Sequence, residues 1–264
     1  MKFFRGAVAA VLTCTLLTGC GLNGAGRSSE AKYEGDGFKT AEAAATSFVE
    51  GLRDLDYNKM LKSYAWETQA EHYKYESELD RFDSFIPTMP VQMPSDNDFY
   101  ISANASGLQS IECRRLYCSI AYYLMKDDVE KGMVIPLKDE ESMNDFLSIY
   151  DNERYKDFTK IKNLRFVSPE EVLGDACSMD EYNEKAQINY EHYGADEVVS
   201  LAALADVGDK TFYYFPTVAR YGDKWYVVSS WSLISSYLQM DAYTPFKITN
   251  ETPKDWINKQ DNEE

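Results

Sequence analysis

Two Gly-Asp pairs in the last quarter of the chain constrain its fold most strongly. Gly208-Asp209 and Gly222-Asp223 each separate two runs that are rich in aromatic and β-branched residues. Because Gly readily adopts the positive φ of a tight turn, each pair predicts two antiparallel strands joined by a short loop. We therefore expect an antiparallel meander with strands at about 196–206, 211–221 and 224–234. The first run also suits a helix. Pro216, in the second, should lie at a bulge or on an edge, because it cannot donate to the ladder.

Helical patterns precede this meander. Thr40 is a good N-cap, and apolar residues follow it at helical spacing from 41 to 55. Asp56 can cap a second short helix that ends near Tyr64, and a third helical stretch covers 66–82. Helices first and antiparallel strands later predict an α+β fold, with the N-terminal helices packed on a curved antiparallel β-sheet.

The central part of the chain carries weaker patterns. Three prolines between 86 and 98 exclude a helix there. Apolar residues alternate with others from 116 to 124, which predicts a half-buried strand. Helical spacing returns at 138–155, and a short strand is expected at 162–167.

The first twenty residues form a pattern of their own. Lys2 and Arg5 precede an uncharged, largely apolar run from 6 to 19. This run is too short to span a bilayer but has the length of a signal-peptide core. It leads to Leu17-Thr18-Gly19-Cys20, which resembles the lipobox of bacterial lipoproteins; the alternative is a chance cysteine after an ordinary signal. The resemblance implies cleavage after residue 19 and a thioether-linked diacylglycerol on Cys20.

The lipobox resemblance also implies a location. The acyl chains on Cys20 would hold the protein in the lipid bilayer, at the outer face of the bacterial cytoplasmic membrane, or at the outer membrane if the host has one. Residues 20–38 are rich in Gly, Ser and charge, and we expect them to form a flexible tether. Residues 246–264 are expected to be a polar C-terminal tail with a turn near Trp256, which leaves 39–245 as the folded domain.

Two stretches resemble nuclear transport factor two-like (cystatin-like) domains. TAEAAATSFVEGLRDLDYNKMLKSYA (40–65) resembles the paired short helices at the start of such domains. TVARYGDKWYVVSSW (217–231) resembles their last hairpin, in which a Lys-Trp pair opens the final strand. The resemblance implies a cone-like arrangement of helices and curved sheet whose interior holds a small ligand or a partner peptide. It also makes the segment from about 83 to 195 a long central insertion.

Cysteine and histidine residues offer little chemistry. Cys113, Cys118 and Cys177 lie beyond the signal and the lipobox, and permit either one disulfide of unknown pairing or three free thiols. The three cysteines do not provide the fourth ligand that a zinc site needs.

His72 and His192 each stand between Glu and Tyr, which could suggest a metal or an acid–base pair, but a histidine in an acid-rich segment is the simpler interpretation. No nucleotide-binding or nucleophile motif is present, so we expect no metal and no cofactor.

Charge and aromatic content complete the prediction. The chain has 27 Lys and Arg against 44 Asp and Glu, and such an acidic surface repels nucleic acid. The aromatic residues are weak candidates for a pocket, since ordinary core packing is the simpler interpretation: Tyr64, Trp66, Trp225 and Trp231, with Phe212 and Tyr214. The sequence thus predicts a non-catalytic binding module for a protein, peptide or envelope component. An enzyme of the same fold, acting on a small molecule in the cone, is the alternative.

Overall fold

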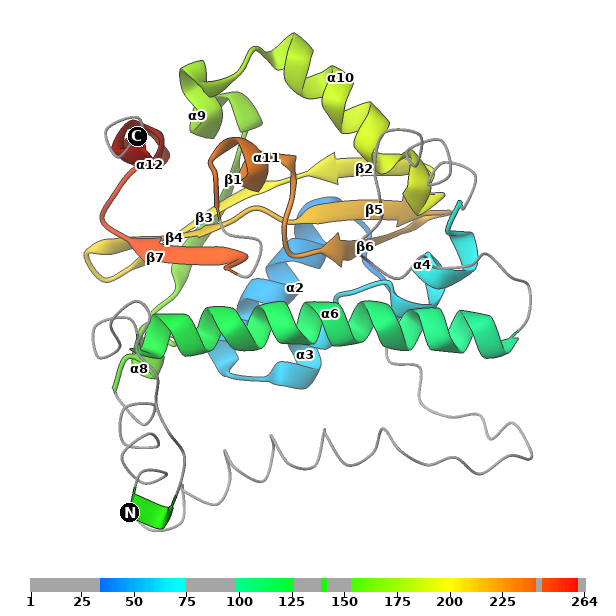
Figure 1. The fold of residues 1–264 in the computed structure, drawn as a ribbon, viewed down its shortest axis with the longest axis horizontal. Helices are drawn as coiled ribbons and strands as arrows, with labels where there is room; N and C mark the ends of the chain where they lie inside the picture. The colour runs from blue at the N-terminus through cyan, green and yellow to red at the C-terminus, as the bar shows by residue number, and fades with distance from the viewer. Residues whose placement is uncertain (1–33, 75–97, 126–138, 142–152, 241–243, 261–264) are drawn as a thin grey trace. The chain divides into compact units, whose positions relative to one another are not determined.

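The computed structural model describes residues 34–74, 98–125, 139–141, 153–240 and 244–260. Its N-terminal helices are followed by antiparallel strands, so the predicted α+β class is confirmed (Figure 1). The helices are α2 (Ala41–Asp54), α3 (Tyr57–Leu61), α4 (Trp66–His72), α6 (Asp98–Met125), α8 (Tyr155–Phe158), α9 (Pro169–Leu173), α10 (Met179–Tyr190), α11 (Leu233–Tyr237) and α12 (Pro253–Gln260), with 3-10 turns η1 (Gly174–Ala176) and η2 (Glu191–Tyr193). The strands are β1 (Lys162–Val167), β2 (Glu197–Ser200), β3 (Ala202–Val207), β4 (Lys210–Tyr214), β5 (Thr217–Tyr221), β6 (Lys224–Ser229) and β7 (Phe246–Thr249).

The first helices begin where their capping residues predict. Thr40 Oγ1 accepts a hydrogen bond from the N–H of Ala43 at 3.1 Å, and Asp56 Oδ1 accepts one from the N–H of Lys59 at 3.0 Å. These bonds satisfy N–H groups that have no partner inside the helix. Between α2 and α3, Leu55 has a φ of 54° and turns the chain. Of the predicted third helix, residues up to 72 form α4, and 75–82 lie outside the described residues.

The centre of the sheet is one long hairpin with a bend. Only Leu201 separates β2 from β3, and only Phe215 and Pro216 separate β4 from β5. Strand β3 pairs with β4 and β2 pairs with β5, both antiparallel. At the bend, the N–H of Leu201 donates to the carbonyl of Pro216 at 3.0 Å. The first predicted run is therefore strand and not helix. Each of the first two predicted strands is divided in two where Pro216 interrupts the ladder.

Three more strands extend the two halves of this hairpin. Strands β1 and β7 flank one half, which gives the order β1-β3-β4-β7, and β6 flanks the other, which gives β2-β5-β6. The turns at Gly208 and Gly222 have φ values of 64° and 61°, which confirms the two predicted hairpins. The third predicted strand ends at Ser229, because residues 233–237 form α11.

Alternation along β4 divides the core into two layers. Phe212 and Tyr214 pack with α2, whereas Tyr213 and Phe215 pack with α9, α11 and α12. In Figure 1, α2, α3 and α6 lie on one side of the strands and α9 to α12 on the other. Successive strand side chains point to opposite faces, so a continuous apolar run is what a sheet covered on both faces requires.

The strand predicted at 116–124 is wrong. These residues form the C-terminal part of α6. Five of the buried side chains of α6 recur every three, four or seven residues, as on one helix face: Ala105, Glu112, Leu116, Ser119 and Tyr123; Ala121 and Leu124 are buried too. Two of them are polar, so the buried face is not visible as an apolar stripe, and the alternation beginning at Leu116 was mistaken for the period of a strand.

The N-terminal boundary of the domain lies earlier than predicted. Residues 34–38, expected in the tether, are docked on the domain. Gly35 donates to the carbonyl of Lys62 at 3.1 Å, and Phe38 exchanges two backbone hydrogen bonds with Trp225, at 3.0 and 2.8 Å. These backbone contacts are long-range, and the polar composition of the segment does not indicate them.

The C-terminal boundary also needs correction. The predicted polar tail contains β7, which pairs with β4, and α12. Trp256 is 6 % exposed and meets the ring of Tyr213 edge-on at 5.1 Å. The buried Trp256 ring thus docks α12 on the sheet.

The central segment is joined to the rest of the domain. The strand predicted at 162–167 is confirmed as β1, which pairs with β3. Residues 33 to 264 form one compact unit, so the described parts of 83–195 belong to the same body as the hairpin. Helix α6 packs most closely along α4. The proline-rich stretch up to 97 and most of the helix predicted at 138–155 lie outside the described residues. Among the described helices, none combines the length and the apolar composition needed to cross a bilayer.

Candidate functional site

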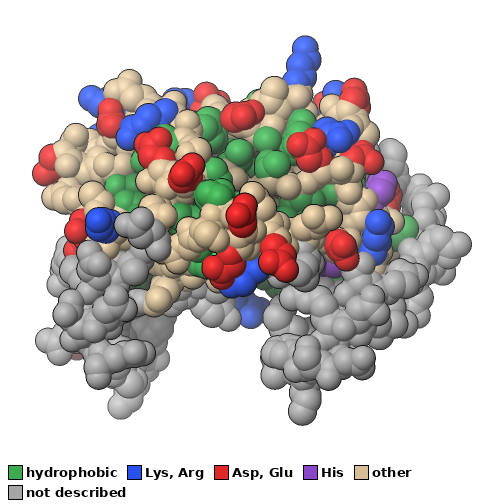
Figure 2. All heavy atoms as spheres, turned by 90° about the horizontal axis from the view of Figure 1, so that it is seen from above, with side chains coloured by type: hydrophobic (Ala, Val, Ile, Leu, Met, Phe, Trp, Pro, Cys, Tyr) green, Lys and Arg blue, Asp and Glu red, His purple; other side chains and the backbone are tan. Residues whose placement is uncertain are grey.

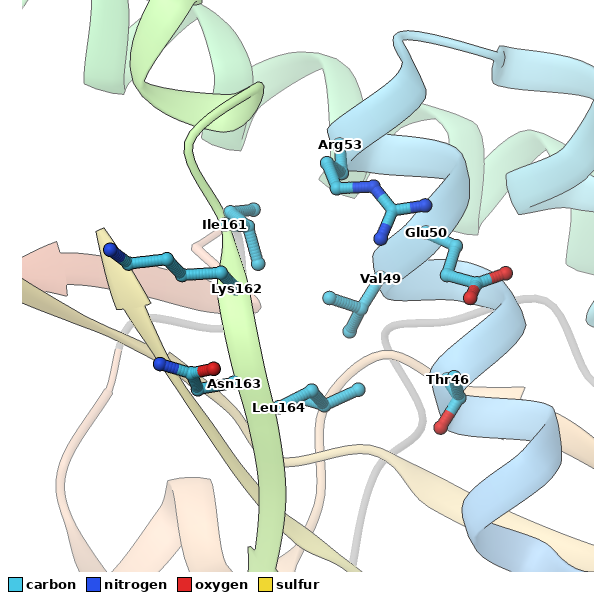
Figure 3. Close-up of a pocket in the computed structure, with 8 residues that line it drawn as sticks. All are labelled: Thr46, Val49, Glu50, Arg53, Ile161, Lys162, Asn163 and Leu164. Atoms are coloured by element: carbon cyan, nitrogen blue, oxygen red, sulfur yellow. The ribbon is translucent and has the colours of Figure 1, made fainter. Parts of the chain in front are cut away.

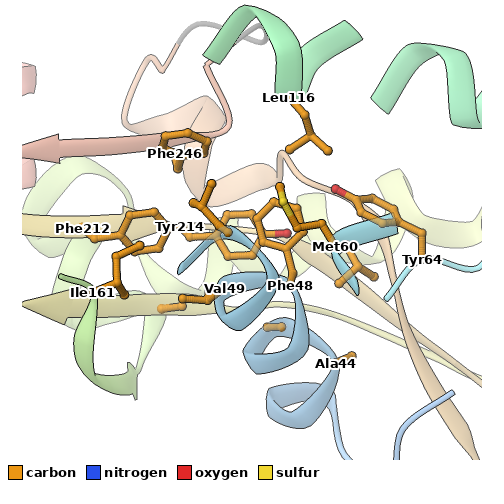
Figure 4. Packing of buried hydrophobic residues seen from close by; sticks show 14 of the residues in the cluster. Ala44, Phe48, Val49, Met60, Tyr64, Leu116, Ile161, Phe212, Tyr214 and Phe246 are labelled. Carbon is orange, nitrogen blue, oxygen red and sulfur yellow. The ribbon is translucent and has the colours of Figure 1, made fainter. Parts of the chain in front are cut away.

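Aromatic side chains fill the space between α2 and the bent hairpin. Phe48 of α2 stacks on Tyr214 of β4 with ring centroids 4.5 Å apart, and meets Tyr64 edge-on at 6.1 Å. Tyr64 stacks in turn on Trp66 at 4.5 Å. All four side chains are at most 1 % exposed. Figure 4 shows Phe48, Tyr64 and Tyr214 among the aliphatic side chains of this cluster, below Leu116 of α6. The rings therefore form a packed core and not the wall of an open cavity.

The four predicted pocket residues do not meet in one pocket. Tyr64 and Trp66 lie together in the core. Trp225 is partly buried at the margin of the same cluster, with the guanidinium of Arg220 5.9 Å from its ring centre. Trp231 lies in the loop after β6, where its indole N–H donates to a backbone carbonyl at 3.4 Å.

A buried carboxylate adjoins these rings. Glu112 of α6 is 4 % exposed. Its Oε2 accepts hydrogen bonds from the N–H of Ser230 at 3.1 Å, from the Ser230 hydroxyl at 2.5 Å and from the Tyr64 hydroxyl at 3.4 Å. Its Oε1 lies 2.5 Å from Nη1 of Arg115. Burial removes water from a carboxylate, and such partners replace the lost hydrogen bonds; here both of its oxygens are engaged.

The helical period of α6 aligns the charged pair. Glu112 and Arg115 are three residues apart, which puts them on neighbouring positions of one helix face. Arg115 Nη1 also donates to the Ser229 hydroxyl at 3.1 Å. The hydroxyl of Ser119 donates to the carbonyl of Arg115 at 2.8 Å and so finds its partner within the helix. Two adjacent serines at the end of β6 thereby connect to one turn of α6.

The hydroxyl of Tyr214 lies close to this network but is not part of it. It is fully buried and makes no hydrogen bond of standard geometry within the described part of the chain, although it lies near the Tyr64 hydroxyl. Burial raises the pKa values of Tyr64 and Tyr214 well above their usual range, and the nearby charge of Glu112 raises both further. Both hydroxyls therefore keep their protons at neutral pH. Leaving a buried hydroxyl unpaired costs about 1–3 kcal/mol, so Tyr214 offers one unused hydrogen bond at this place.

Sequence reasoning did not identify this network. An acid three residues before an arginine suggests an ion pair only if both lie on a helix. The residues directly after Arg115, 116–124, were predicted to form a strand, so no such pair was expected between Glu112 and Arg115. Ser230 lies 118 residues further along the chain. No local pattern indicates such a distant contact, so the carboxylate site becomes visible only in the folded structure.

A shallow pocket lies between α2 and β1 (Figure 3). It is lined by Thr46, Val49, Glu50, Arg53, Ile161, Lys162, Asn163 and Leu164 and has a volume of about 80 Å³. Sites for drug-sized ligands occupy about 300–1,000 Å³. The two charged side chains that α2 contributes already have partners, since Arg53 pairs with Asp54 at 2.9 Å and Glu50 with Lys59 at 2.8 Å. This pocket therefore lacks the volume of a substrate site, and both charged side chains of α2 are already paired.

The three cysteines within the described residues are all unbonded. Cys113 and Cys118 are five residues apart on α6, which places them about 140° apart around the helix axis and about 7.5 Å apart along it. That geometry excludes a disulfide between them. Burial raises the pKa of the Cys113 thiol, which lies beside the Tyr57 hydroxyl, and burial also raises the pKa of Cys177. Cys20 lies outside the described residues, so its lipid stays a prediction.

The structure brings the two histidines to one region, where α4 meets η2. Nδ1 of His72 lies 2.8 Å from the carbonyl oxygen of Thr68, and its ring centre is 5.1 Å from that of Tyr221. The ring of His192 is 4.2 Å from that of Tyr193. In the part of the chain that the structure describes, no three metal-binding side chains gather at one point. The surroundings of the histidines are therefore aromatic and not those of a metal centre.

We expect Gly194→Ala to destabilise this junction. Gly194 has a φ of 62°, and a Cβ there would lie 1.7 Å from the carbonyl oxygen of His72. Relief would require movement of α4 away from η2, which are joined by the hydrogen bond from Lys74 N–H to the His192 carbonyl at 3.0 Å. The free energy of unfolding, measured by urea denaturation, should fall by about 3 kcal/mol.

Gly208→Ala is the matched control for this substitution. Gly208 has a nearly identical φ of 64°, but no atom lies within 4 Å of the position that a Cβ would take. Only backbone strain is then added, and the loss should be about 1 kcal/mol. Equal losses in the two variants would contradict the close approach of α4 and η2.

Comparison with known proteins does not assign the chain to a family. No protein-family profile matches it, and no curated protein matches it either. Among solved structures, it is similar to a cystatin-like protein from Ruminococcus gnavus, with a TM-score of 0.43 and 10 % sequence identity. The match covers 90 % of this chain and 47 % of that chain, so this chain spans about half the length of the other protein.

Proposed function

We propose that this protein is a lipid-anchored extracytoplasmic binding module with a nuclear transport factor two-like (cystatin-like) domain. Its partner would be a protein, a peptide or an envelope component, and it would catalyse no reaction. The observation that carries the proposal is the filled interior, where Phe48, Tyr64 and Tyr214 are fully buried against one another. An enzyme of the same arrangement would need an accessible cavity with a titratable group inside it.

The state of Glu112 also supports binding over catalysis. A general acid or base must reach a substrate proton with a free oxygen. Both oxygens of Glu112 are held, one by Arg115 at 2.5 Å and the other by Ser230 and Tyr64. In this conformation the carboxylate holds elements together, and it presents no free oxygen to a substrate.

Charge limits the class of partner. The net charge of −17 opposes contact with the phosphates of nucleic acid. On the face shown in Figure 2, acidic side chains are interspersed with hydrophobic and basic ones, and the basic ones do not form a stripe. A protein, peptide or envelope component is therefore a better partner for this surface than a polynucleotide.

The tether proposed for the anchor is shorter than the sequence predicted. Packing of the domain begins at Glu34, whose carboxylate accepts hydrogen bonds from the N–H and the hydroxyl of Thr68, at 2.9 and 2.6 Å. Residues 21–33 would then link the lipid on Cys20 to the domain. A chain of that length spans at most about 45 Å when fully extended, so the domain would work close to the bilayer surface.

We expect Cys20→Ala to release the protein from the membrane fraction. Each buried CH₂ group contributes about 0.8 kcal/mol to membrane attachment, so loss of two acyl chains removes the anchor. Ultracentrifugation of cell lysates followed by immunoblotting measures the distribution. Cys14→Ala is the matched control, because it changes a cysteine of the predicted signal and leaves the lipobox intact.

Unchanged membrane fractionation of Cys20→Ala would contradict the lipoprotein proposal. Mass spectrometry of the mature N-terminus gives an independent measurement, since a lipidated Cys20 should be the first residue. Cross-linking on intact cells tests the binding proposal, with Cys20→Ala as the mislocalised control. Recovery of a specific envelope component by the wild type alone is the expected result, and its absence would count against a binding role.

A further inference from the structure

Three residues outside α6 converge on the Glu112 carboxylate, and we call them the donor cluster: Tyr64, Tyr214 and Ser230. Ser230 donates twice to Oε2, and Tyr64 donates once to the same oxygen. Tyr214 is fully buried beside them, and its hydroxyl makes no hydrogen bond of standard geometry to a described residue; it lies next to the Tyr64 hydroxyl. Tyr64 lies two residues before the start of α4, Tyr214 is the last residue of β4, and Ser230 directly follows β6. None of the three belongs to α6, so the rest of the fold assembles the cluster.

The donor cluster has the chemistry of a carboxylate site. It presents one N–H and three hydroxyls, and these four donors suit the lone pairs of two carboxylate oxygens. Phosphate carries more charge and is usually bound through Arg or Lys. The arginine at this place, Arg115, belongs to α6 and would leave with it. A planar, singly charged acid is therefore the ligand that this cluster fits best.

Glu112 enters the donor cluster from a helix whose closest packing lies elsewhere. Helix α6 packs along α4. Its polar links to the end of β6 and to the loop that follows are the bonds from Ser230 to Glu112 and from Arg115 to Ser229. Near its C-terminal end, the Tyr123 hydroxyl donates to Asp157 of α8 at 2.6 Å. A displacement of α6 that breaks these side-chain bonds and withdraws Leu116, Tyr123 and Leu124 from the main core would uncover the cluster and leave the β-ladders intact.

We propose that the donor cluster is a binding site for a carboxylate and that Glu112 occupies it as an internal substitute for the ligand. A small organic acid, or the acidic side chain of a peptide, replaces Glu112 when α6 moves aside. This inference rests on the proposed binding function but not on the lipid anchor. The Tyr214 hydroxyl, which makes no hydrogen bond to Glu112, provides the difference that favours exchange, because an external carboxylate is free to accept a hydrogen bond from it.

The test uses the full-length chain with Glu112→Ala, which empties the cluster. Propionate has the same carboxylate as the lost side chain, and propionamide is its neutral counterpart. At constant ionic strength, propionate at ten times its Kd should raise the Tm by about 3–6 °C, and propionamide should not.

A blocked tripeptide with a central Glu, compared with its Gln counterpart, distinguishes a peptide side chain from a free acid as the preferred source. Adding Tyr64→Phe or Ser230→Ala should weaken either effect several-fold.

The proposal is overturned if propionate and propionamide act alike, or if removal of the donors leaves the effect unchanged. If Glu112→Ala does not fold by itself, the same pairs of compounds are compared for recovery of helical signal by circular dichroism, with the same criteria. In the wild type, the effective ligand should accelerate amide hydrogen exchange in 98–125, since it displaces α6. A negative result in these measurements would contradict the carboxylate site, but it would not change the fractionation and cross-linking results that test the anchored binding module. The two proposals can therefore be contradicted independently.

Discussion

Phe48→Ala should lower the free energy of unfolding by about 4 kcal/mol. The Phe48 side chain is 0 % exposed. It stacks on Tyr214 at 4.5 Å with an interplanar angle of 16°, and it also meets Tyr64 edge-on. Truncation removes the aromatic contacts and leaves a cavity between α2 and the sheet, which the bent hairpin cannot close without moving its ladder. Urea denaturation followed by far-UV circular dichroism measures the change.

Two variants control this measurement. Phe48→Leu keeps most of the volume and should lose less than about 1.5 kcal/mol. Leu55→Ala changes an apolar residue next to the same helix that is 52 % exposed, and should stay within about 0.5 kcal/mol of the wild type. A loss in Phe48→Ala no larger than that in Phe48→Leu would show that the interior is not packed as described.

Glu112→Ala should destabilise the protein by about 3–5 kcal/mol, which is the range for removal of one partner from a buried ion pair. The substitution leaves Arg115 without its carboxylate and leaves the donors of Ser230 and Tyr64 unpaired. The loss should therefore exceed that of an ordinary side-chain truncation at the same burial. The urea midpoint gives the magnitude, and an unchanged m-value shows that the same structure unfolds.

A double-mutant cycle separates the ion pair from the other contacts. Arg115→Met should cost less in the Glu112→Ala background than in the wild type, because the charge that it removes no longer has a partner. Glu181→Ala, which breaks an exposed pair with Lys185, serves as the control and should have little effect. Additive losses from Glu112 and Arg115 would contradict the coupling that the 2.5 Å contact implies.

The N-terminal helices and the hairpins were predictable because their signals are local. Thr40 and Asp56 satisfy the first N–H groups of α2 and α3 from three residues away. Gly208 and Gly222 supply positive φ at two tight turns. Pro216 interrupts the ladder because it has no N–H. Each of these effects acts within a few residues, so it does not depend on contacts with distant parts of the chain.

The site was predictable only in its aromatic part. Tyr64 and Trp66 were named as weak pocket candidates, with core packing as the simpler interpretation, and they lie stacked in the core. Glu112 was missed because its partners are distant in sequence, with Ser230 118 residues away. Its helix was missed for a related reason: burial of Glu112 and Ser119 hides the apolar stripe by which α6 would be recognised.

The sequence by itself determined where α2 and α3 begin, where the hairpins turn and where the strand pair bends, because capping, positive φ and a missing N–H act on neighbouring residues. Only the tertiary structure decided that 116–124 is helix and that 34–38 and 246–260 belong to the domain. It also decided that the Glu112 carboxylate is buried and hydrogen-bonded to Ser230. These outcomes depend on burial and on hydrogen bonds between distant segments. A polar residue becomes part of a core when the rest of the fold supplies its partners.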